Sequence, residues 1–173
     1  KESISCSEKA IAKDPKNVTA LNNLGEYNQE IGNEDLSITY YKKALEIEPE
    51  NLRSKWLMMN TFPIIYKNFE QIDYFKKHFE KNLRSLEDLI SKNNIFEKKQ
   101  ILSALNSSTN FYLHYHGDDI TSLQKRYGAL VTKLTKKIFP QFHNKISLTK
   151  TSGFIKVGFI SPFFFEHVVT KLF

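Results

Sequence analysis

A 34-residue period constrains the fold of this 173-residue chain more than any other feature. Within residues 18–51, two stretches with apolar residues at helical spacing flank a break at Gly32, and Pro49 ends the second stretch. Ala10 lies 34 residues before Ala44, so the period also extends backwards. Two helices joined by a tight turn form a hairpin. Because one hairpin cannot bury its own apolar face, we expect a stacked array of hairpins and further repeats before Lys1.

The period and its marked positions are those of the tetratricopeptide repeat. The matching residues are Leu21, Leu24, Gly25, Gly32, Tyr41, Ala44 and Pro49. Gly25 and Ala44 are small, so the two helices of the hairpin can approach closely. A degenerate repeat follows, in which Trp56 takes the first large position, Asn60 replaces the small glycine and Pro63 interrupts the first helix.

A long amphipathic helix is predicted next, over residues 64–90. Its apolar stripe consists of Phe69, Ile72, Phe75, Phe79, Leu83, Leu86 and Ile90. We interpret this stripe, together with Trp56, as core rather than binding surface. Residues 1–90 are therefore assigned to the repeats, the last of them degenerate.

Residues 91–145 are predicted to form a helical linker region. A short helix is expected at 96–105 and a longer one at 120–138, where Pro140 ends the pattern. His114 and His116 could be metal ligands, but no third ligand follows at a convincing spacing. We interpret them as structural histidines and predict no metal.

The stretch "FIKVGFIS", at residues 154–161, predicts a β-strand. It is short, apolar and β-branched, and Gly153 and Pro162 bound it. A strand after a long helical region is typical of the start of an α/β domain, whose ligand crevice lies at the carboxyl ends of the strands. Residues 146–173 are therefore predicted to begin a domain that this sequence does not complete, and His167 follows its first strand.

Composition excludes several classes of protein. No apolar run reaches the roughly 18–20 residues of a membrane helix. The net charge is +6, but lysines alternate with acids along the chain, so we predict neither a nucleic-acid nor a membrane partner. The single cysteine, Cys6, excludes an internal disulfide framework and fits a reducing compartment. We expect a cytoplasmic protein.

The order of these parts resembles one enzyme family. The repeats are followed by "KWLMMNTFPIIY", by "FYLHYHG" and "LQKRYGALV", and then by "KVGFISPFFFEHVV". This order is similar to that of the SPINDLY-like and O-linked N-acetylglucosamine transferase-like protein glycosyltransferases. One residue departs from the family pattern, because Phe163 stands where an acidic residue is expected after Ser-Pro.

The resemblance implies transfer of a sugar from a nucleotide sugar, such as UDP-N-acetylglucosamine or GDP-fucose, to Ser or Thr of a protein acceptor. It implies a two-lobed fold of paired Rossmann-like domains (GT-B) and no metal or other cofactor. The repeats would bind the acceptor, with Asn23 at an inner-surface asparagine position, and His167 would be the active-site histidine. The sequence as it stands is expected to be inactive, because one strand cannot build a pyrophosphate site. The alternative is a non-catalytic repeat scaffold for protein–protein interaction, with residues 156–173 as an apolar tail.

Overall fold

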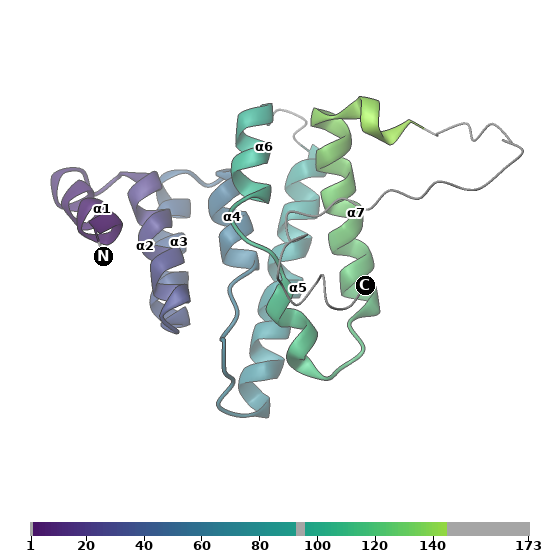
Figure 1. Cartoon of the computed structure of the whole chain (residues 1–173), viewed down its shortest axis with the longest axis horizontal. Helices are drawn as coiled ribbons and strands as arrows, with labels where there is room; N and C mark the ends of the chain where they lie inside the picture. Colours follow the sequence, from purple (N-terminus) through teal and green to yellow (C-terminus); the bar gives the residue numbers. More distant parts are fainter. Residues whose placement is uncertain (1, 93–95, 145–173) are drawn as a thin grey trace, which may run out of the picture. The chain divides into compact units, whose positions relative to one another are not determined.

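The computed structural model describes residues 2–92 and 96–144. The predicted strand at 154–161 and His167 lie outside the described residues. Within the described part the chain is mostly helical and contains no strand (Figure 1). The elements are α1 Glu2–Lys13, α2 Val18–Glu30, α3 Glu34–Ile47, α4 Leu52–Met59, α5 Phe69–Lys92, α6 Lys98–Leu105, η1 Phe111–His116, α7 Thr121–Ile138 and η2 Pro140–His143, where η denotes a 3₁₀ helix.

The helices α2 and α3 form the predicted antiparallel hairpin. Asn17 caps α2 by accepting a hydrogen bond from the Ala20 backbone amide at 2.9 Å. Between the helices Gly32 has φ +78°, a conformation that glycine adopts without steric cost. Gly25 faces the ring of Tyr41 so closely that a side chain at position 25 would overlap it. The small residue at this position is therefore what allows the two helices to pack.

The helix α4 ends at Met59, before Pro63, as the sequence predicts. The backbone amide of Asn60 donates to the Trp56 carbonyl at 3.1 Å, and its side-chain Nδ2 donates to the same carbonyl at 3.1 Å. Asn60 thus closes the last turn of α4 with both its backbone and its side chain. Trp56 is almost fully buried, which confirms its predicted place in the core.

The long helix α5 carries the apolar stripe that the sequence predicts, with one correction. Phe75 and Phe79 are buried, as are Leu83, Leu86 and Ile90. Phe69, by contrast, is 85% exposed, and the prediction that it belongs to the core is wrong. The helix begins at Phe69, not at residue 64, so this ring sits at the free end of the first turn.

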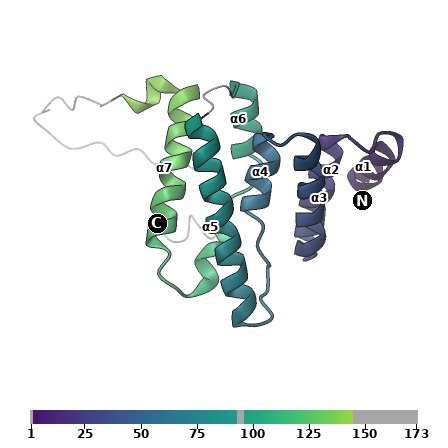
Figure 2. The ribbon, with the colours of Figure 1, turned by 180° about the vertical axis from the view of Figure 1, so that it is seen from behind.

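One apolar core joins the repeat-like part to the region after residue 90. In the view from behind, α5 lies between α4 and α7 (Figure 2). Trp56 and Phe79 belong to the same buried cluster as Ile101 of α6 and Leu130 of α7. The Trp56 indole also donates a hydrogen bond to the Ser108 carbonyl at 3.0 Å. Residues 2–143 therefore form one compact unit, whose core is continuous across residue 90.

The predicted helix at 120–138 is confirmed as α7, and η2 begins at Pro140. Arg126 of α7 donates two hydrogen bonds to the Glu87 carboxylate of α5, from Nε at 3.1 Å and from Nη2 at 2.6 Å. None of the helices in the described ranges is both long enough and apolar enough to cross a membrane.

Candidate ligand-binding groove

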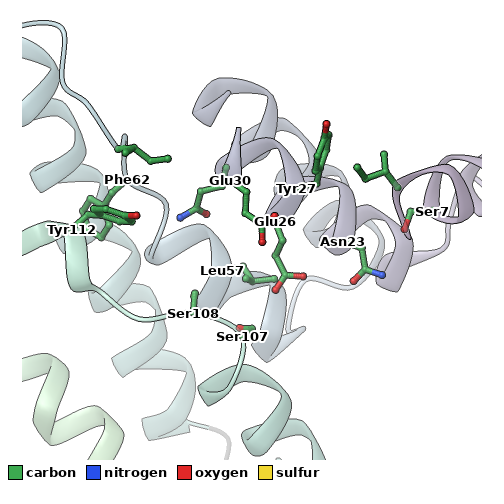
Figure 3. A pocket seen from close by; sticks show the side chains of 13 residues that line it. Ser7, Asn23, Glu26, Tyr27, Glu30, Leu57, Phe62, Ser107, Ser108 and Tyr112 are labelled. Carbon is green, nitrogen blue, oxygen red and sulfur yellow. The ribbon is translucent and has the colours of Figure 1, made fainter. Parts of the chain in front are cut away.

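A groove of about 440 Å³ opens between α1 and α2 on one side and α4 with the segments that follow α4 and α6 on the other. One wall consists of Asn23, Glu26, Tyr27 and Glu30 of α2, with Ser7 of α1 beside them (Figure 3). The opposite wall is formed by Leu57, Phe62, Ser107, Ser108 and Tyr112. The groove thus has an acidic side on α2 and an opposite side that combines hydroxyls with apolar and aromatic side chains.

Helical spacing explains the first wall. Asn23, Glu26 and Glu30 follow one another at intervals of three and four residues, which places them on one face of α2. The opposite face of the same helix is occupied by Leu21 and Leu24, which are buried. The chain therefore presents a polar row to the groove without losing the core packing of α2.

Asn23, the acceptor-binding residue that the sequence predicts, is exposed and lines this groove. Its Oδ1 lies 3.5 Å from Nη2 of Arg53, which comes from the first turn of α4. The same Nη2 donates to Glu26 Oε2 at 2.7 Å. Arg53 of α4 therefore contacts two groove residues of α2, while the Asn23 Nδ2 donor remains available to a ligand.

The Glu26 carboxyl lies in an environment that disfavours its charge. Burial raises the pKa of Glu26, and the nearby Arg53 guanidinium offsets this only in part. Glu30, one turn further along α2, is exposed. Two carboxyl groups against one paired arginine leave this wall with negative charge, suited to donors and cations on a ligand.

The opposite wall could not be found from the sequence. Asn106-Ser107-Ser108 matches the glycosylation-acceptor pattern, which indicates no binding groove. The Ser108 carbonyl accepts from the Trp56 indole and so holds this loop beside the groove. Arg53 was not predicted from the sequence either, although it lies 30 residues after Asn23, close to the 34-residue period. Glu26 was the one that could have been predicted, since it lies three residues after Asn23 on the same helix face.

The two histidines considered as metal ligands have other partners. His116 Nε2 lies 2.5 Å from the Tyr66 hydroxyl, and His114 Nε2 lies 3.1 Å from Gln124 Nε2. Within residues 2–92 and 96–144 no group of three or more His, Cys, Asp or Glu side chains is arranged to hold a metal ion. His167, predicted as the catalytic residue, lies outside the described residues.

The chain matches no protein-family model, no curated protein and no solved structure. The function of the groove is therefore argued from the residues that line it. The lining combines two amides, two carboxyls and several hydroxyls with apolar side chains, a combination that can hold a peptide backbone and its side chains.

Proposed function

We propose that the groove binds an extended segment of a protein, and that this segment is the acceptor of a protein O-glycosyltransferase of the SPINDLY or O-linked N-acetylglucosamine transferase-like kind. The observation that carries the proposal is the position of Asn23 on the groove wall, with Arg53 orienting its Oδ1. The two N–H donors of its Nδ2 would then be available to a backbone carbonyl of the bound segment.

The opposite wall supports binding of a side chain as well as a backbone. Ile64, which is 49% exposed, and the half-buried Tyr112 provide an apolar surface in the groove, while Phe62 lies beneath them with no exposed surface. Burial of an apolar side chain there would supply affinity, since apolar contact contributes about 25 cal/mol per Å² removed from water. The polar row on α2 would then set the register of the segment.

The proposed reaction is transfer of a sugar from a nucleotide sugar to a Ser or Thr hydroxyl, with His167 as the group that takes or orients the hydroxyl proton. A neutral imidazole is available near pH 7 because its ordinary pKa is about 6.5. No metal takes part in this proposal. The enzyme would act in the cytoplasm, a location that the single free cysteine, Cys6, suits.

Binding is tested with peptides that contain Ser and Thr, selected on the full chain and measured by fluorescence anisotropy. Asn23→Ala is expected to weaken binding about fivefold, the effect of one neutral hydrogen bond of about 1 kcal/mol. Asn33→Ala is the matched control, because Asn33 is exposed, makes no side-chain cap and lies outside the groove. Equal affinities for the two variants would rule out the proposed role of Asn23.

Catalysis is tested separately, in the complete protein, at saturating donor and acceptor. His167→Ala is expected to lower the rate by about 10²–10⁴-fold if the imidazole acts as general base. A loss below about fivefold, with the fold intact, leaves His167 only a positioning role. Peptide binding without any sugar transfer would favour the second candidate, a non-catalytic scaffold that uses the same groove.

A further inference from the structure

One wall of the groove contains a segment without helical structure. We call residues 61–67, between α4 and α5, the strap. Ile64 of the strap lines the groove with 49% of its surface exposed, and Phe62 lies beneath it. Within the described part of the chain, the backbone of residues 61–67 makes no hydrogen bond to other backbone groups. The position of the strap therefore depends on its side chains.

His116 contacts two of these side chains, one on each side of Ile64 in the sequence. Its ring centroid lies 5.8 Å from that of Phe62 and 5.0 Å from that of Tyr66. Its Nε2 lies 2.5 Å from the Tyr66 hydroxyl. His116 is also the last residue of η1, the element that supplies Tyr112 to the groove. The strap and η1, which both line the groove, thus meet at one imidazole.

The hydrogen bonding of His116 favours the neutral imidazole. His116 is only 7% exposed, and its Nδ1 is buried with no hydrogen-bond partner among the described residues. In the neutral ring Nδ1 can be the nitrogen without a proton, while Nε2 donates to the Tyr66 hydroxyl. In the charged ring both nitrogens carry N–H groups, so Nδ1 becomes a buried donor without an acceptor. Because such a group is costly to leave unpaired, the charged ring is expected to move towards water.

Three charged side chains act on this contact. Lys76 of α5 donates to Asp118, which follows η1, at 2.7 Å between Nζ and Oδ2. Burial lowers the pKa of His116, Lys76 lowers it further, and Asp118 offsets both only in part. Burial raises the pKa of Tyr66 and Glu34 of α3 raises it further, so the phenol keeps its proton. Together these groups favour the neutral imidazole in the folded structure.

We propose that protonation of His116 frees Tyr66 and moves Ile64 out of the groove, so that the bound protein segment dissociates as the pH falls. This regulation rests on the proposed function, since it acts on the groove that binds the segment. Phe62 stays packed on Phe79 of α5, with ring centroids 5.6 Å apart. The movement therefore concerns the part of the strap that follows Phe62.

The direction of the pH effect follows from the two positions of the ring. Well above pH 6.5 the imidazole is neutral whether the strap is held or freed, so protons do not affect the strap. A ring that reaches water has its ordinary pKa of about 6.5, which is higher than the pKa of the held ring. The freed state therefore takes up the proton first, and its share grows as the pH falls from about 6.5 towards the lowered value.

The first test measures binding of a selected peptide without Asp, Glu or His, by fluorescence anisotropy at pH 7.5 and pH 5.5. We expect the wild type to bind at least about fivefold more weakly at pH 5.5, the cost of one unpaired buried donor. His116→Gln, whose amide does not titrate, is expected to lose this difference. His114→Gln is the matched control and is expected to keep it, because His114 is exposed on the same 3₁₀ helix and lies outside the groove. The raised pKa of Glu26 affects all three proteins alike.

The second test needs no peptide, so its outcome does not depend on the proposed function. The Ile64 methyl and the His116 ring are followed by NMR in the full chain as the pH is lowered. We expect the Ile64 methyl shift to change with the same midpoint as the His116 ring, and to stay constant in His116→Gln. Ile11 of α1, which packs in the separate apolar cluster of α2 and α3, provides a reference methyl that is expected not to change.

The two tests have distinguishable failures. Absence of peptide binding at both pH values, with coincident midpoints for Ile64 and His116, would reject the proposed function and still support the movement of the strap. Equal binding at the two pH values, or an Ile64 methyl that does not follow His116, would overturn the proposal. So would equal behaviour of His116→Gln and His114→Gln. Loss of the helical circular dichroism signal over the same interval would also overturn it, because the whole chain would then unfold instead of the strap.

Discussion

Gly25 of α2 lies against the ring of Tyr41 on α3 so tightly that a Cβ at position 25 would stand 2.3 Å from Tyr41 Cε1. Tyr41 is fully buried, so its ring cannot simply swing into solvent. We predict that Gly25→Ala lowers the free energy of unfolding by about 1–3 kcal/mol, the usual effect of overpacking a core. Urea denaturation followed by circular dichroism measures this change.

Gly128 provides the matched control for that substitution. It lies inside α7, and a Cβ added there meets no atom within 4 Å. Because alanine is the better helix former, Gly128→Ala is expected to raise the free energy of unfolding by about 0.5–1 kcal/mol. If both variants shift the free energy of unfolding in the same direction, the close contact between Gly25 and Tyr41 does not exclude a side chain at position 25.

Truncation of two phenylalanines of α5 is predicted to change the free energy of unfolding by very different amounts. Phe79 is 0% exposed and packs on Phe62 with ring centroids 5.6 Å apart, whereas Phe69 is 85% exposed. Phe79→Ala is expected to lower the free energy of unfolding by about 3–5 kcal/mol. Phe69→Ala is expected to change it by less than about 0.5 kcal/mol. A loss above about 1 kcal/mol for Phe69→Ala would mean that this ring is covered in solution.

The same pair shows how far the sequence predicts the fold. The 34-residue period places the helix pair and its turn, and the apolar stripe of α5 identifies its buried face from Phe75 to Ile90. Periodicity alone could not tell that Phe69 is excluded, because Phe69 continues the stripe and its exposure depends on where α5 begins. The helix begins at Phe69 because Asn68 caps it, with the Asn68 Oδ1 accepting a hydrogen bond from the Gln71 backbone amide at 2.9 Å.

The groove could be predicted only in part, for a related reason. Asn23 follows from the repeat register, since a position within a repeat fixes the face of the helix. Arg53 and Ser108 reach the groove through contacts between elements, the ion pair with Glu26 and the indole hydrogen bond of Trp56. Such contacts join residues far apart in sequence and leave no local pattern. The predicted catalytic residue, His167, stays a prediction because it lies outside the described residues.

The ion pair between α5 and α7 is expected to contribute measurably to stability. Arg126 donates Nε and Nη2 to the two oxygens of Glu87 at 3.1 and 2.6 Å, and Nη1 to Glu80 at 3.3 Å. Bidentate geometry makes this pair stronger than ordinary surface pairs, although partial exposure limits it. Arg126→Gln is expected to lower the free energy of unfolding by about 1 kcal/mol, and by less in high salt.

The control for this pair is Lys77→Gln on α5. Lys77 also contacts a carboxylate, Asp73 at 2.6 Å, but both side chains are well exposed. Exposed pairs four residues apart contribute about 0.3–0.5 kcal/mol at most, so this variant is expected to stay near the wild type. Equal effects of the two substitutions at low salt would show that the contact between α5 and α7 adds nothing beyond a surface charge pair.

Stability is predicted to fall as the pH drops from about 7 to about 5. Burial lowers the pKa of His116, and Lys76 lowers it further while Asp118 partly offsets both. Burial also lowers the pKa of His78, against the raising effect of its hydrogen bond to the Met58 carbonyl. Both folded histidines therefore favour the neutral form, and the unfolded chain takes up protons first. Their contribution is fully present above pH 6.5 and is lost as the pH falls towards the lowered folded values.

The double variant His78→Gln, His116→Gln isolates this effect. The raised pKa of Glu26 works in the opposite direction, because a carboxyl that binds its proton more tightly in the folded state gains stability on acidification. That contribution is the same in both proteins, so it cancels from the difference between their curves of unfolding free energy against pH. We expect the wild-type curve to fall more steeply below pH 6.5 than that of the double variant. Parallel curves would mean that neither histidine resists protonation in the folded state. The contacts of His116 with Tyr66 and of His78 with Met58 would then hold the charged imidazole as well as the neutral one.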